Sequence, residues 1–541
     1  MNAGDTDRRR FLLAAAGAGL AGAGGCRRSP PPVPPAQWVG DSAERGHRLH
    51  THLPDARGGA PSGAPSGAPA VRRAQIVVVG AGVAGLAAAR ALGRRGLDDL
   101  AVLDLESQPG GNSRGHRMAG LDCPLGAHYL PLPGPNALAV SEWLHEIGLL
   151  HTSHGRSVPD ERHLCHSPQE RLFIDGAWHD GLLPPAEPGG STLIQYQAWA
   201  GEVARAQTLG FAIPTARARW SAALAELDGQ TFATWLDARG LRDERLRWYL
   251  DYACRDEYGA DASTVSAWAG LHYFAGRQGF HAPGDDAPGR DAVFTWPEGN
   301  AWLIRRLAQP LAGRLHAGRL VHAVRVEREG VQVDAWDIAS GRPERWQARA
   351  VVVAVPLFVA ARLLADPPPA LVAAASRMRY APWLVANLAL REPLLDRGLG
   401  APASWDNVRY GSPSLGYVDA GHQRLSPAAG PTVITAYWPL TTTERSKLLA
   451  DTASDWGHRI TADLQAAHPD LPEKVQQIDL ARHGHAMSIP VPGTRGSTAL
   501  AALRELRGPV QFAHADLAGY SVFEEAFEQG ERAARVLLEE R

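Results

Sequence analysis

The sequence is poor in cysteine, in net charge and in long apolar runs. Its 541 residues include 4 cysteines (Cys26, Cys123, Cys165 and Cys254), and no two of them form a CxxC pair. We therefore predict neither a zinc site nor a disulfide framework, and no metal is expected. No apolar run reaches the roughly 18 residues that a transmembrane helix requires. A formal charge of −2 without a basic stripe argues against nucleic-acid binding.

The first residues carry a pattern typical of a targeting signal. Arg8 and Arg9 precede Phe11 and a weakly apolar run of small residues, so that residues 1–26 resemble a twin-arginine (Tat) export signal. Cys26 is placed like the cysteine of a lipoprotein site, and cleavage after Ala23 to give a soluble product is the alternative. We expect export by the Tat translocase to the periplasm, with peripheral membrane attachment if Cys26 is lipidated. Residues 27–72 are rich in Pro, Gly and Ser and are expected to form a disordered linker.

A glycine-rich turn follows the first strongly apolar segment. Ile76–Val79 is β-branched and apolar, as expected of a strand buried on both faces of a parallel sheet. Gly80 permits the tight turn, Gly82 lets the backbone approach a pyrophosphate, and Gly85 lets the next helix pack close to the strand. That helix, from Val83 to about Arg95, presents its N-terminus to the phosphates. The turn predicts dinucleotide binding by Gly80, Gly82, Val83, Ala84 and Gly85.

The next segment supplies an acid and a second turn without side chains. A predicted strand from Leu100 to Glu106 ends in an acid about 20 residues beyond the first turn, where a ribose hydroxyl is expected. Asp104 is the better candidate and Glu106 the alternative. Two glycines and polar residues follow. The predicted cofactor contacts in this segment are Asp104, Leu105, Gly110, Gly111, Asn112, Ser113 and Arg114.

These segments resemble the flavin-containing amine oxidase superfamily, which includes monoamine and polyamine oxidases, protoporphyrinogen oxidases and phytoene desaturases. The stretch VLDLESQPGGNSRG looks like the family's VLEARDRVGGRxxS, and LDCPLGAHYL resembles its D-x-G-x-x-W segment. The resemblance covers residues 73–541 in separated blocks. It implies FAD as a resident cofactor, with Gly126, Ala127 and His128 beside the flavin ring.

Two later blocks extend the resemblance. Residues 319–337 and the buried strand Ala350–Val355 resemble the family's β-meander, in which the backbone around Val324 would meet the adenine. The C-terminal block resembles the family's closing FAGD…GxxEGAxxSGxxAA motif. It implies that Asp516 holds the ribityl chain or the pyrophosphate, and that a helix from Val522 points its N-terminus at the flavin, with Ser521 and Val522 as contacts.

The blocks together predict an α/β protein with two domains. A discontinuous Rossmann-like FAD-binding domain, made of a parallel sheet plus a β-meander, is expected at 73–150, 290–360 and 495–541. A mixed α+β substrate-binding or cap domain is expected at 151–289 and 361–494. Residues 150–290 are predicted to be mostly helical, because apolar and aromatic residues recur three and four positions apart.

Lysine is scarce in this chain, and this bears on the electron acceptor. Many members of the family hold a lysine, through water, at the reactive flavin nitrogen. Lys447 and Lys474 are the two lysines of the chain, and neither matches that position, since both lie in polar segments that predict surface helices. We therefore expect slow reoxidation by O₂ and transfer of electrons to a quinone or a soluble carrier. The C-terminal motif contains no cysteine, so FAD is expected to be non-covalent.

His128, His485 and Tyr520 are the candidates for the catalytic wall. His483 and His485 are two residues apart, so they share one face if the segment is a strand. A metal would need a third ligand, and packing or hydrogen bonding is the alternative role for this pair. Tyr520 lies near one position of the aromatic pair that faces the flavin in the family, with the register shifted by two extra residues.

The resemblance implies an FAD-dependent oxidoreductase that oxidises a small-molecule amine, with a polyamine as one option, by hydride transfer to non-covalent FAD. One alternative is a desaturase or dehydrogenase of a hydrophobic substrate, such as a carotenoid or porphyrin precursor. Another is a flavin-binding protein without turnover. Acids and aromatic faces in the cavity favour an amine, whereas a long apolar tunnel favours a hydrophobic substrate.

Overall fold

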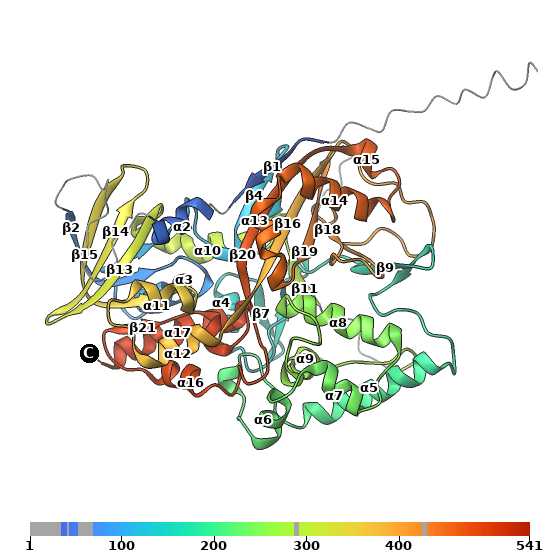
Figure 1. Ribbon diagram of the computed structural model, residues 1–541, viewed down its shortest axis with the longest axis horizontal. Coiled ribbons are helices and arrows are strands. Elements are labelled where there is room, and N and C mark those ends of the chain that lie inside the picture. Colours follow the sequence, from blue (N-terminus) through green and yellow to red (C-terminus); the bar gives the residue numbers. More distant parts are fainter. Residues whose placement is uncertain are drawn as a thin grey trace, which may run out of the picture.

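The strand before the glycine-rich turn lies inside a seven-stranded sheet, which we call the cofactor sheet (Figure 1). The computed structural model describes residues 34–40, 43–51, 69–277, 279–285, 292–424 and 430–540. The sheet has the order β12-β3-β2-β15-β14-β13, and β21 pairs with β15. Its strands are β2 (Ala70–Val79), β3 (Leu100–Leu103), β12 (Leu315–His316), β13 (Arg319–Glu327), β14 (Gly330–Asp337), β15 (Arg342–Val353) and β21 (Val510–Phe512).

The cofactor sheet has the predicted composition of a parallel sheet plus a β-meander. β2 runs parallel to β3 and to β15, and β15 runs parallel to β21. β13, β14 and β15 form the antiparallel meander. Val77 and Val78 of β2 are fully buried, as expected of a strand covered on both faces. The predicted α/β, Rossmann-like fold is confirmed.

Helices from the two ends of the chain cover the cofactor sheet. α3 (Val83–Arg94) follows the glycine-rich turn, and α17 (Phe523–Glu539) packs against it. The other helices of this half are α4 (Leu138–Glu146), α10 (Ala301–Ala308), α11 (Leu357–Leu363), α12 (Pro369–Arg377) and α16 (Thr498–Glu505). The alanine-rich face of α3 lets α17 approach closely, because alanine adds little bulk at the contact.

The contact between α3 and α17 depends on Gly530. A Cβ atom at this position would lie 2.3 Å from the Ala84 carbonyl oxygen and 2.9 Å from the Ala87 Cβ. We expect Gly530→Ala to lower the free energy of unfolding by about 2 kcal/mol, because overpacking forces two helices apart. Urea unfolding measures the change. Gly313→Ala is the matched control, since a Cβ there meets nothing within 4 Å; an equal loss in both variants would contradict this account of the contact.

A second sheet of eight strands forms the other half of the molecule. Its order is β1-β20-β16-β19-β18-β17-β9-β10. Most neighbours are antiparallel, whereas β1 and β20, and likewise β17 and β9, run parallel. Its strands are β1 (Ala36–Val39), β9 (Glu170–Ile174), β10 (Ala177–Asp180), β16 (Arg379–Leu390), β17 (Asp406–Arg409), β18 (Tyr417–Asp419), β19 (Thr432–Pro439) and β20 (Val475–Ile489).

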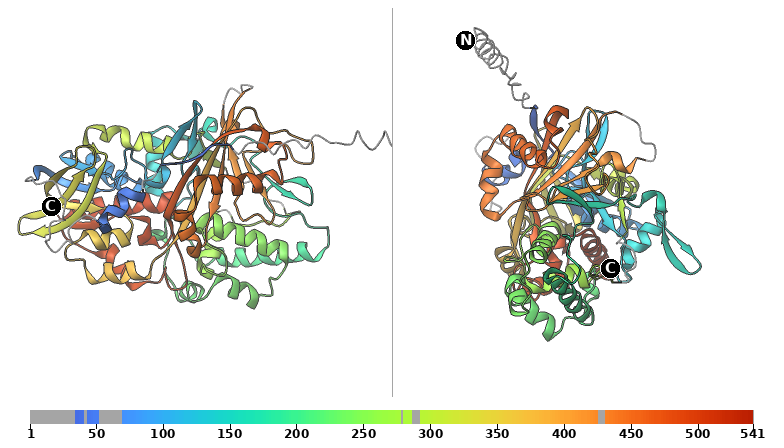
Figure 2. Two further views of the ribbon diagram at one scale, coloured as in Figure 1. Left: turned by 45° about the horizontal axis from the view of Figure 1, so that its top comes forward. Right: turned by 90° about the vertical axis from the view of Figure 1, so that its right-hand side faces the viewer.

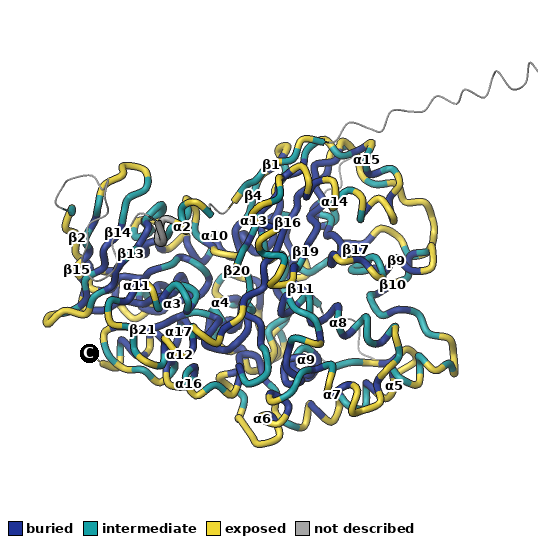
Figure 3. Tube along the Cα trace, viewed as in Figure 1, coloured by how far each residue is buried: buried dark blue, intermediate teal, exposed yellow. Residues whose placement is uncertain are grey.

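Two groups of helices pack on this second sheet. Five helices form one layer beside it (Figure 2): α5 (Ser191–Gln207), α6 (Ala222–Asp228), α7 (Phe232–Ala238), α8 (Glu244–Tyr258) and α9 (Ala267–Ala275). Their aromatic side chains join those of the sheet in one core. A further cluster packs α14 (Ala453–Gln465) against β16 and β20, near α13 (Arg445–Ala450) and α15 (Leu471–Lys474). Figure 3 shows the buried positions running through both halves.

The sequence-based boundaries need two corrections. Apart from one 3-10 turn at Glu161–His163, residues 150–180 form the hairpins β7 (Leu150–Ser153) with β8 (Arg156–Pro159) and β9 with β10. Part of the expected linker is folded, because β1 pairs with β20 and α2 (Ala43–Thr51) forms a helix. The expectation of disorder therefore does not hold for these residues. The remaining strands are β4 (Gly115–Met118), β5 (Leu121–Pro124), β6 (Tyr129–Pro131) and β11 (Val293–Thr295).

Several expectations concern parts of the chain that the structure does not describe. The twin-arginine pair, Cys26 and most of the linker lie outside the described residues. Within the described ranges, no helix combines the length and apolarity needed to span a bilayer. The same ranges contain no cluster of three or more His, Cys, Asp or Glu side chains arranged to hold a metal ion.

Candidate active site

A cavity of about 400 Å³ lies between the two halves, and the glycine-rich turn forms one end of its wall. Gly80 adopts a φ of +101°, which only glycine tolerates readily. A Cβ at Gly85 would lie 1.9 Å from the Gly80 carbonyl oxygen, so Gly85 allows the helix to pack against the turn. A Cβ at Gly82 would meet no atom within 4 Å, because this residue faces the open cavity. Gly80 and Gly85 thus have the turn and packing roles predicted for them, and Gly82 leaves open the space that its predicted role requires.

Asp104 lies at the end of β3 beside the turn. Its Oδ2 accepts a hydrogen bond from the Ala81 N–H at 2.6 Å, and its Oδ1 accepts one from the Glu106 N–H at 2.8 Å. Burial raises the pKa of Asp104, although these two hydrogen bonds lower it. The carboxyl lines the cavity, whereas Glu106 does not. Of the two predicted acids, only Asp104 therefore lies at the cavity, where a ribose could contact it.

The second turn lies against the first. The Gly110 N–H donates to the Ala81 carbonyl at 2.8 Å, and Gly110, Gly111, Asn112 and Ser113 all line the cavity. Arg114 does not line it. Its Nε donates to the Gly111 carbonyl at 3.1 Å and its Nη1 lies 3.7 Å from Glu106 Oε2, while burial lowers its pKa to about 10. Arg114 therefore stabilises the second turn through its backbone and does not contact the cavity.

Gly126, Ala127 and His128, which are predicted to lie beside the flavin ring, line the cavity. The Ala127 N–H donates to the Asn112 carbonyl at 2.8 Å, which joins this segment to the second turn. The imidazole of His128 stacks on the Tyr437 ring with centroids 4.3 Å apart. Burial lowers the pKa of His128 to about 3, so the imidazole is neutral at physiological pH.

The C-terminal motif forms the opposite wall. Asp516 is buried and accepts hydrogen bonds from Tyr380 Oη at 2.6 Å and from the Leu357 N–H at 2.9 Å. Burial acts to raise the pKa of Asp516, but His514 and these donors outweigh it, and the pKa is lowered. Val522 caps α17 without a side-chain hydrogen bond, and Ser521 and Val522 line the cavity. The first N–H groups of α17 thus belong to residues at the cavity wall.

The far end of the cavity contains a charged group that motifs did not reveal. Asp256 and Glu257, at the C-terminal end of α8, and Arg277, which follows α9, line the wall with Glu524. Arg277 lies 3.4 Å from both Glu257 and Glu524. Among the described residues, Asp256 forms no ion pair with an arginine; Tyr129 Oη donates to it at 3.3 Å. Burial together with Glu257 raises the pKa of Asp256 to about 7, although Tyr129 and the more distant Arg277 act to lower it. The sequence signal was a pair of adjacent acids, Asp256-Glu257, near the end of a helix that also contains Trp248, Tyr249 and Tyr252.

The comparisons with known proteins agree with this geometry. A family model described as flavin containing amine oxidoreductase matches residues 83–538. The chain belongs to the flavin-containing amine oxidoreductase family. A Mycobacterium tuberculosis protein, AofH, named as a flavin-containing monoamine oxidase, is 30% identical over 305 residues, which are 54% of this chain and 59% of AofH. The chain thus aligns with less than two thirds of the length of that curated relative.

Solved structures of flavin-containing amine oxidoreductases share the fold. Putrescine oxidase bound to putrescine superposes with a TM-score of 0.65 at 17% identity, covering 87% of this chain and all of that one. Cyclohexylamine oxidase from Brevibacterium oxydans IH-35A gives a TM-score of 0.65 at 18% identity, covering 86% of this chain and 99% of that one.

Membership of the flavin-containing family implies FAD as the cofactor, and the residues at the cavity fit it. Gly82 leaves a bare backbone where a diphosphate approaches, and two helix N-termini, those of α3 and α17, lie at the wall. Two buried polar atoms of the lining, Trp383 Nε1 and Asn300 Oδ1, make no hydrogen bond within the described residues. Buried polar groups are normally paired, so these atoms fit a site completed by a ligand.

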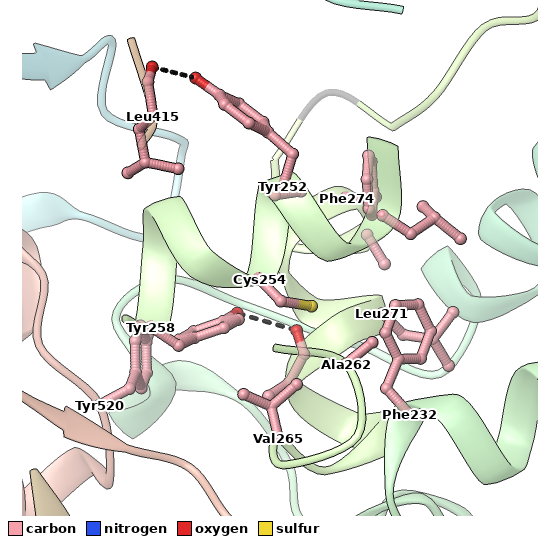
Figure 4. Packing of buried hydrophobic residues seen from close by; sticks show 14 of the residues in the cluster. Phe232, Tyr252, Cys254, Tyr258, Ala262, Val265, Leu271, Phe274, Leu415 and Tyr520 are labelled. Atoms are coloured by element: carbon pink, nitrogen blue, oxygen red, sulfur yellow. Dashed lines mark hydrogen bonds between the residues drawn. The ribbon is translucent and has the colours of Figure 1, made fainter. Parts of the chain in front are cut away.

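Some predicted residues of the flavin-containing amine oxidoreductase lie away from the cavity. Tyr520 does not line it: the side chain is fully buried beside Tyr258 (Figure 4), and its hydroxyl donates to Glu525 at 2.9 Å. Val324 is buried in β13, and its carbonyl accepts from the Ala365 N–H at 3.0 Å. Gly85, Leu105 and Arg114 are also absent from the lining. We therefore correct the catalytic prediction for Tyr520.

His483 and His485 lie on β20 and both line the cavity, as the strand interpretation predicted. His483 Nε2 lies 2.8 Å from the Leu125 carbonyl, which indicates the hydrogen-bonding role. His485 lies at the rim, with ring centroids 4.7 Å from Phe358 and 5.8 Å from Tyr380. Burial and the nearby Arg445 lower the pKa of His485 to about 4.

Neither lysine lies at the cavity. Lys447 is exposed on α13. Lys474 was expected at the surface, but it is buried. Its ammonium lies 2.9 Å from Asp470 and 3.7 Å from Glu392, and these two carboxylates compensate the buried charge. The strand β16 contributes Trp383 and Val385 to the wall instead.

Proposed function

We propose that the protein is an FAD-dependent oxidoreductase that oxidises an amine to an imine, which water then hydrolyses. Family membership supports the class of reaction. The single observation that supports a cationic substrate is Asp256, a partly buried carboxyl of the cavity wall that forms no ion pair with an arginine among the described residues. A buried carboxyl with a pKa near 7 ionises readily when a cation enters, because the opposite charge offsets its loss of water.

The rest of the wall suits an amine better than a long apolar molecule. Its aromatic members include Tyr129, Tyr380, Trp383 and Tyr437, whose faces attract cations. When bound, FAD supplies the ring that accepts the electrons. The neutral His128 adds no positive charge to repel an ammonium, and it fixes Tyr437 by stacking. These features favour the amine over the carotenoid- or porphyrin-like alternative.

The proposal is tested by anaerobic mixing of the purified protein with a panel of amines and of apolar donors. We expect amines, and diamines or polyamines above all, to bleach the flavin absorbance. Bleaching by apolar donors alone would contradict the proposal, and reduction by dithionite alone would favour a protein without turnover.

We also propose that the FAD is non-covalent, since the three cysteines in the described ranges, Cys123, Cys165 and Cys254, do not line the cavity. Acid precipitation should release it quantitatively.

Asp256→Asn is expected to weaken amine binding about tenfold or more, because a charge-assisted contact in a buried site is lost without a change of shape. The variant also tests pH dependence. Since Asp256 must be ionised to pair with an ammonium, affinity in the wild type should rise as pH increases through about 7. That rise should vanish in Asp256→Asn.

The measurement is the amine concentration that gives half-maximal flavin reduction, determined for a diamine and for the monoamine of equal length. A larger loss for the diamine supports a polyamine substrate. Asp122→Asn, an exposed acid on β5, is the control. Equal effects of Asp256→Asn and Asp122→Asn would refute the role of Asp256.

We further propose that electrons pass to a quinone or a soluble carrier rather than to O₂. Val385 and Trp383, and no lysine, stand on the β16 face of the cavity. Stopped-flow reoxidation should be slow in air-saturated buffer and fast with an added quinone. Rapid reoxidation by O₂ with stoichiometric hydrogen peroxide would instead identify a true oxidase.

A further inference from the structure

The strand β1, which precedes the cofactor sheet in the sequence, pairs with β20, the strand that contains His483 and His485. β1 pairs in parallel with Ile478–Ala481 of β20. Gln37 Nε2 donates to Asp479 Oδ1 at 2.9 Å, and the guanidinium of Arg482 lies 4.7 Å from the centre of the Trp38 ring. β20 continues from this contact to His483 and His485 at the cavity. The position of β1 is thus tied to the cavity wall.

The helix that follows β1 contacts the cofactor sheet and the loop after β3. α2 contacts β13 of the cofactor sheet (Figure 1). Its Arg45 Nη1 lies 3.3 Å from Glu106 Oε2. Its His47 is close enough to His485 to add to the lowering of that imidazole's pKa, after burial and Arg445. α2 therefore joins the cofactor sheet to the loop of Asp104 and Glu106.

Glu106 explains why an arginine is needed at this place. Glu106 does not line the cavity, but its carboxylate lies 3.7 Å from Arg114 Nη1, and Arg114 Nε donates to the carbonyl of Gly111 in the cavity wall. A second carboxylate besides Asp104 is therefore only one side chain away from the turn where an anionic diphosphate would bind. Glu106 is 13% exposed, which weakens screening by solvent. Arg114 contacts it at 3.7 Å from within the protein, and Arg45 contacts it at 3.3 Å from α2.

We propose that residues 34–40 and 43–51 form a clasp that retains FAD, in which β1 provides the anchor and Arg45 neutralises Glu106 beside the diphosphate site. Arg45 is a positioning residue that acts through Glu106. The clasp is a property of the cofactor site and does not depend on which substrate is oxidised.

The first test measures the rate at which purified holoprotein releases FAD after dilution, from the recovery of flavin fluorescence. We expect Arg45→Ala to accelerate release about three- to tenfold, since a charge-assisted contact at a partly buried site is lost. Arg45→Lys, which keeps the charge, should stay within about twofold of the wild type. Arg239→Ala is the matched control, because Arg239 contacts Glu202 at the same 3.3 Å but on the helical layer away from the cavity.

A double-mutant cycle tests whether Arg45 acts through Glu106. In a Glu106→Gln background, Arg45→Ala should have little further effect on release, because the charge that it neutralises is gone. A wild-type rate in Arg45→Ala, or an undiminished effect in the Glu106→Gln background, would overturn the proposal.

The second test uses the reciprocity of linked equilibria. If the clasp retains FAD, then FAD must stabilise the clasp by the same free energy. Amide hydrogen exchange over residues 36–51 should therefore be slower in holoprotein than in apoprotein, and Arg45→Ala should reduce that difference. Equal exchange in apo- and holoprotein would overturn the proposal even if Arg45→Ala released FAD.

Discussion

Gly82→Val is expected to yield a folded protein without flavin. The backbone of Gly82 has a φ of −72°, which valine accepts, and a Cβ there meets no protein atom within 4 Å. The space that the side chain would fill is the cavity itself. The substitution therefore lowers the affinity for FAD and not the stability of the fold, because the diphosphate must approach this backbone. We expect a loss of at least about a hundredfold in FAD affinity, or about 3 kcal/mol.

Flavin content after purification, and titration of apoprotein with FAD, measure this effect. Gly85→Val is the informative comparison, since its Cβ would lie 1.9 Å from the Gly80 carbonyl oxygen and so damages the fold. The two variants should separate in circular dichroism: Gly82→Val native-like, Gly85→Val not. Full flavin content in Gly82→Val would show that the phosphate turn is misplaced.

Arg277→Met is expected to destabilise the fold by about 3 kcal/mol or more at neutral pH. Arg277 lies 3.4 Å from each of two buried carboxyl groups, Glu257 and Glu524. Removing one partner of a buried ion pair costs far more than the pair contributes, because a desolvated charge is left behind. Arg239→Met, at a more exposed ion pair, should cost less than about 1 kcal/mol.

The loss in Arg277→Met should depend on pH in a defined direction. Burial raises the pKa of Glu257 even with Arg277 present, and without the arginine it rises further. An acid whose pKa is higher in the folded state contributes stability at low pH that is lost as pH rises through that pKa. As the pH falls from about 8 to about 5, the variant should therefore regain part of its lost free energy of unfolding. Urea titrations at the two pH values check this; a pH-independent loss would mean that packing, not charge, dominates.

The cofactor half was predictable because its signals are local. The turn Gly80–Gly85 and the acid Asp104 lie within one strand-turn-helix-strand unit, where spacing alone determines geometry. The periodicity of α5, α7, α8 and α9 was equally local. By contrast, Lys474 looked like a surface residue, since nothing near it in sequence reveals the contact with Glu392.

The substrate end was not predictable for the same reason. Asp256 and Arg277 come from the helical layer, and only tertiary packing brings them to a cavity whose motifs lie elsewhere in the chain. The prediction misplaced Tyr520, because the sequence motif does not reveal that its hydroxyl donates to Glu525 in the buried core. β1 was missed because four residues in a Pro-rich segment gain their structure from β20, more than four hundred residues later.

The cofactor sheet is assembled from both ends of the sequence, and this sets the order of events during synthesis. β2 and α3 emerge from the ribosome early, but β21 pairs with β15, and α17 packs on α3, only when residues 510–539 have been made. Asp516 and the start of α17 belong to the same late segment. A nascent chain therefore has half a binding site for most of its elongation, and flavin insertion is expected to be post-translational. Contacts between such distant segments also make folding slow.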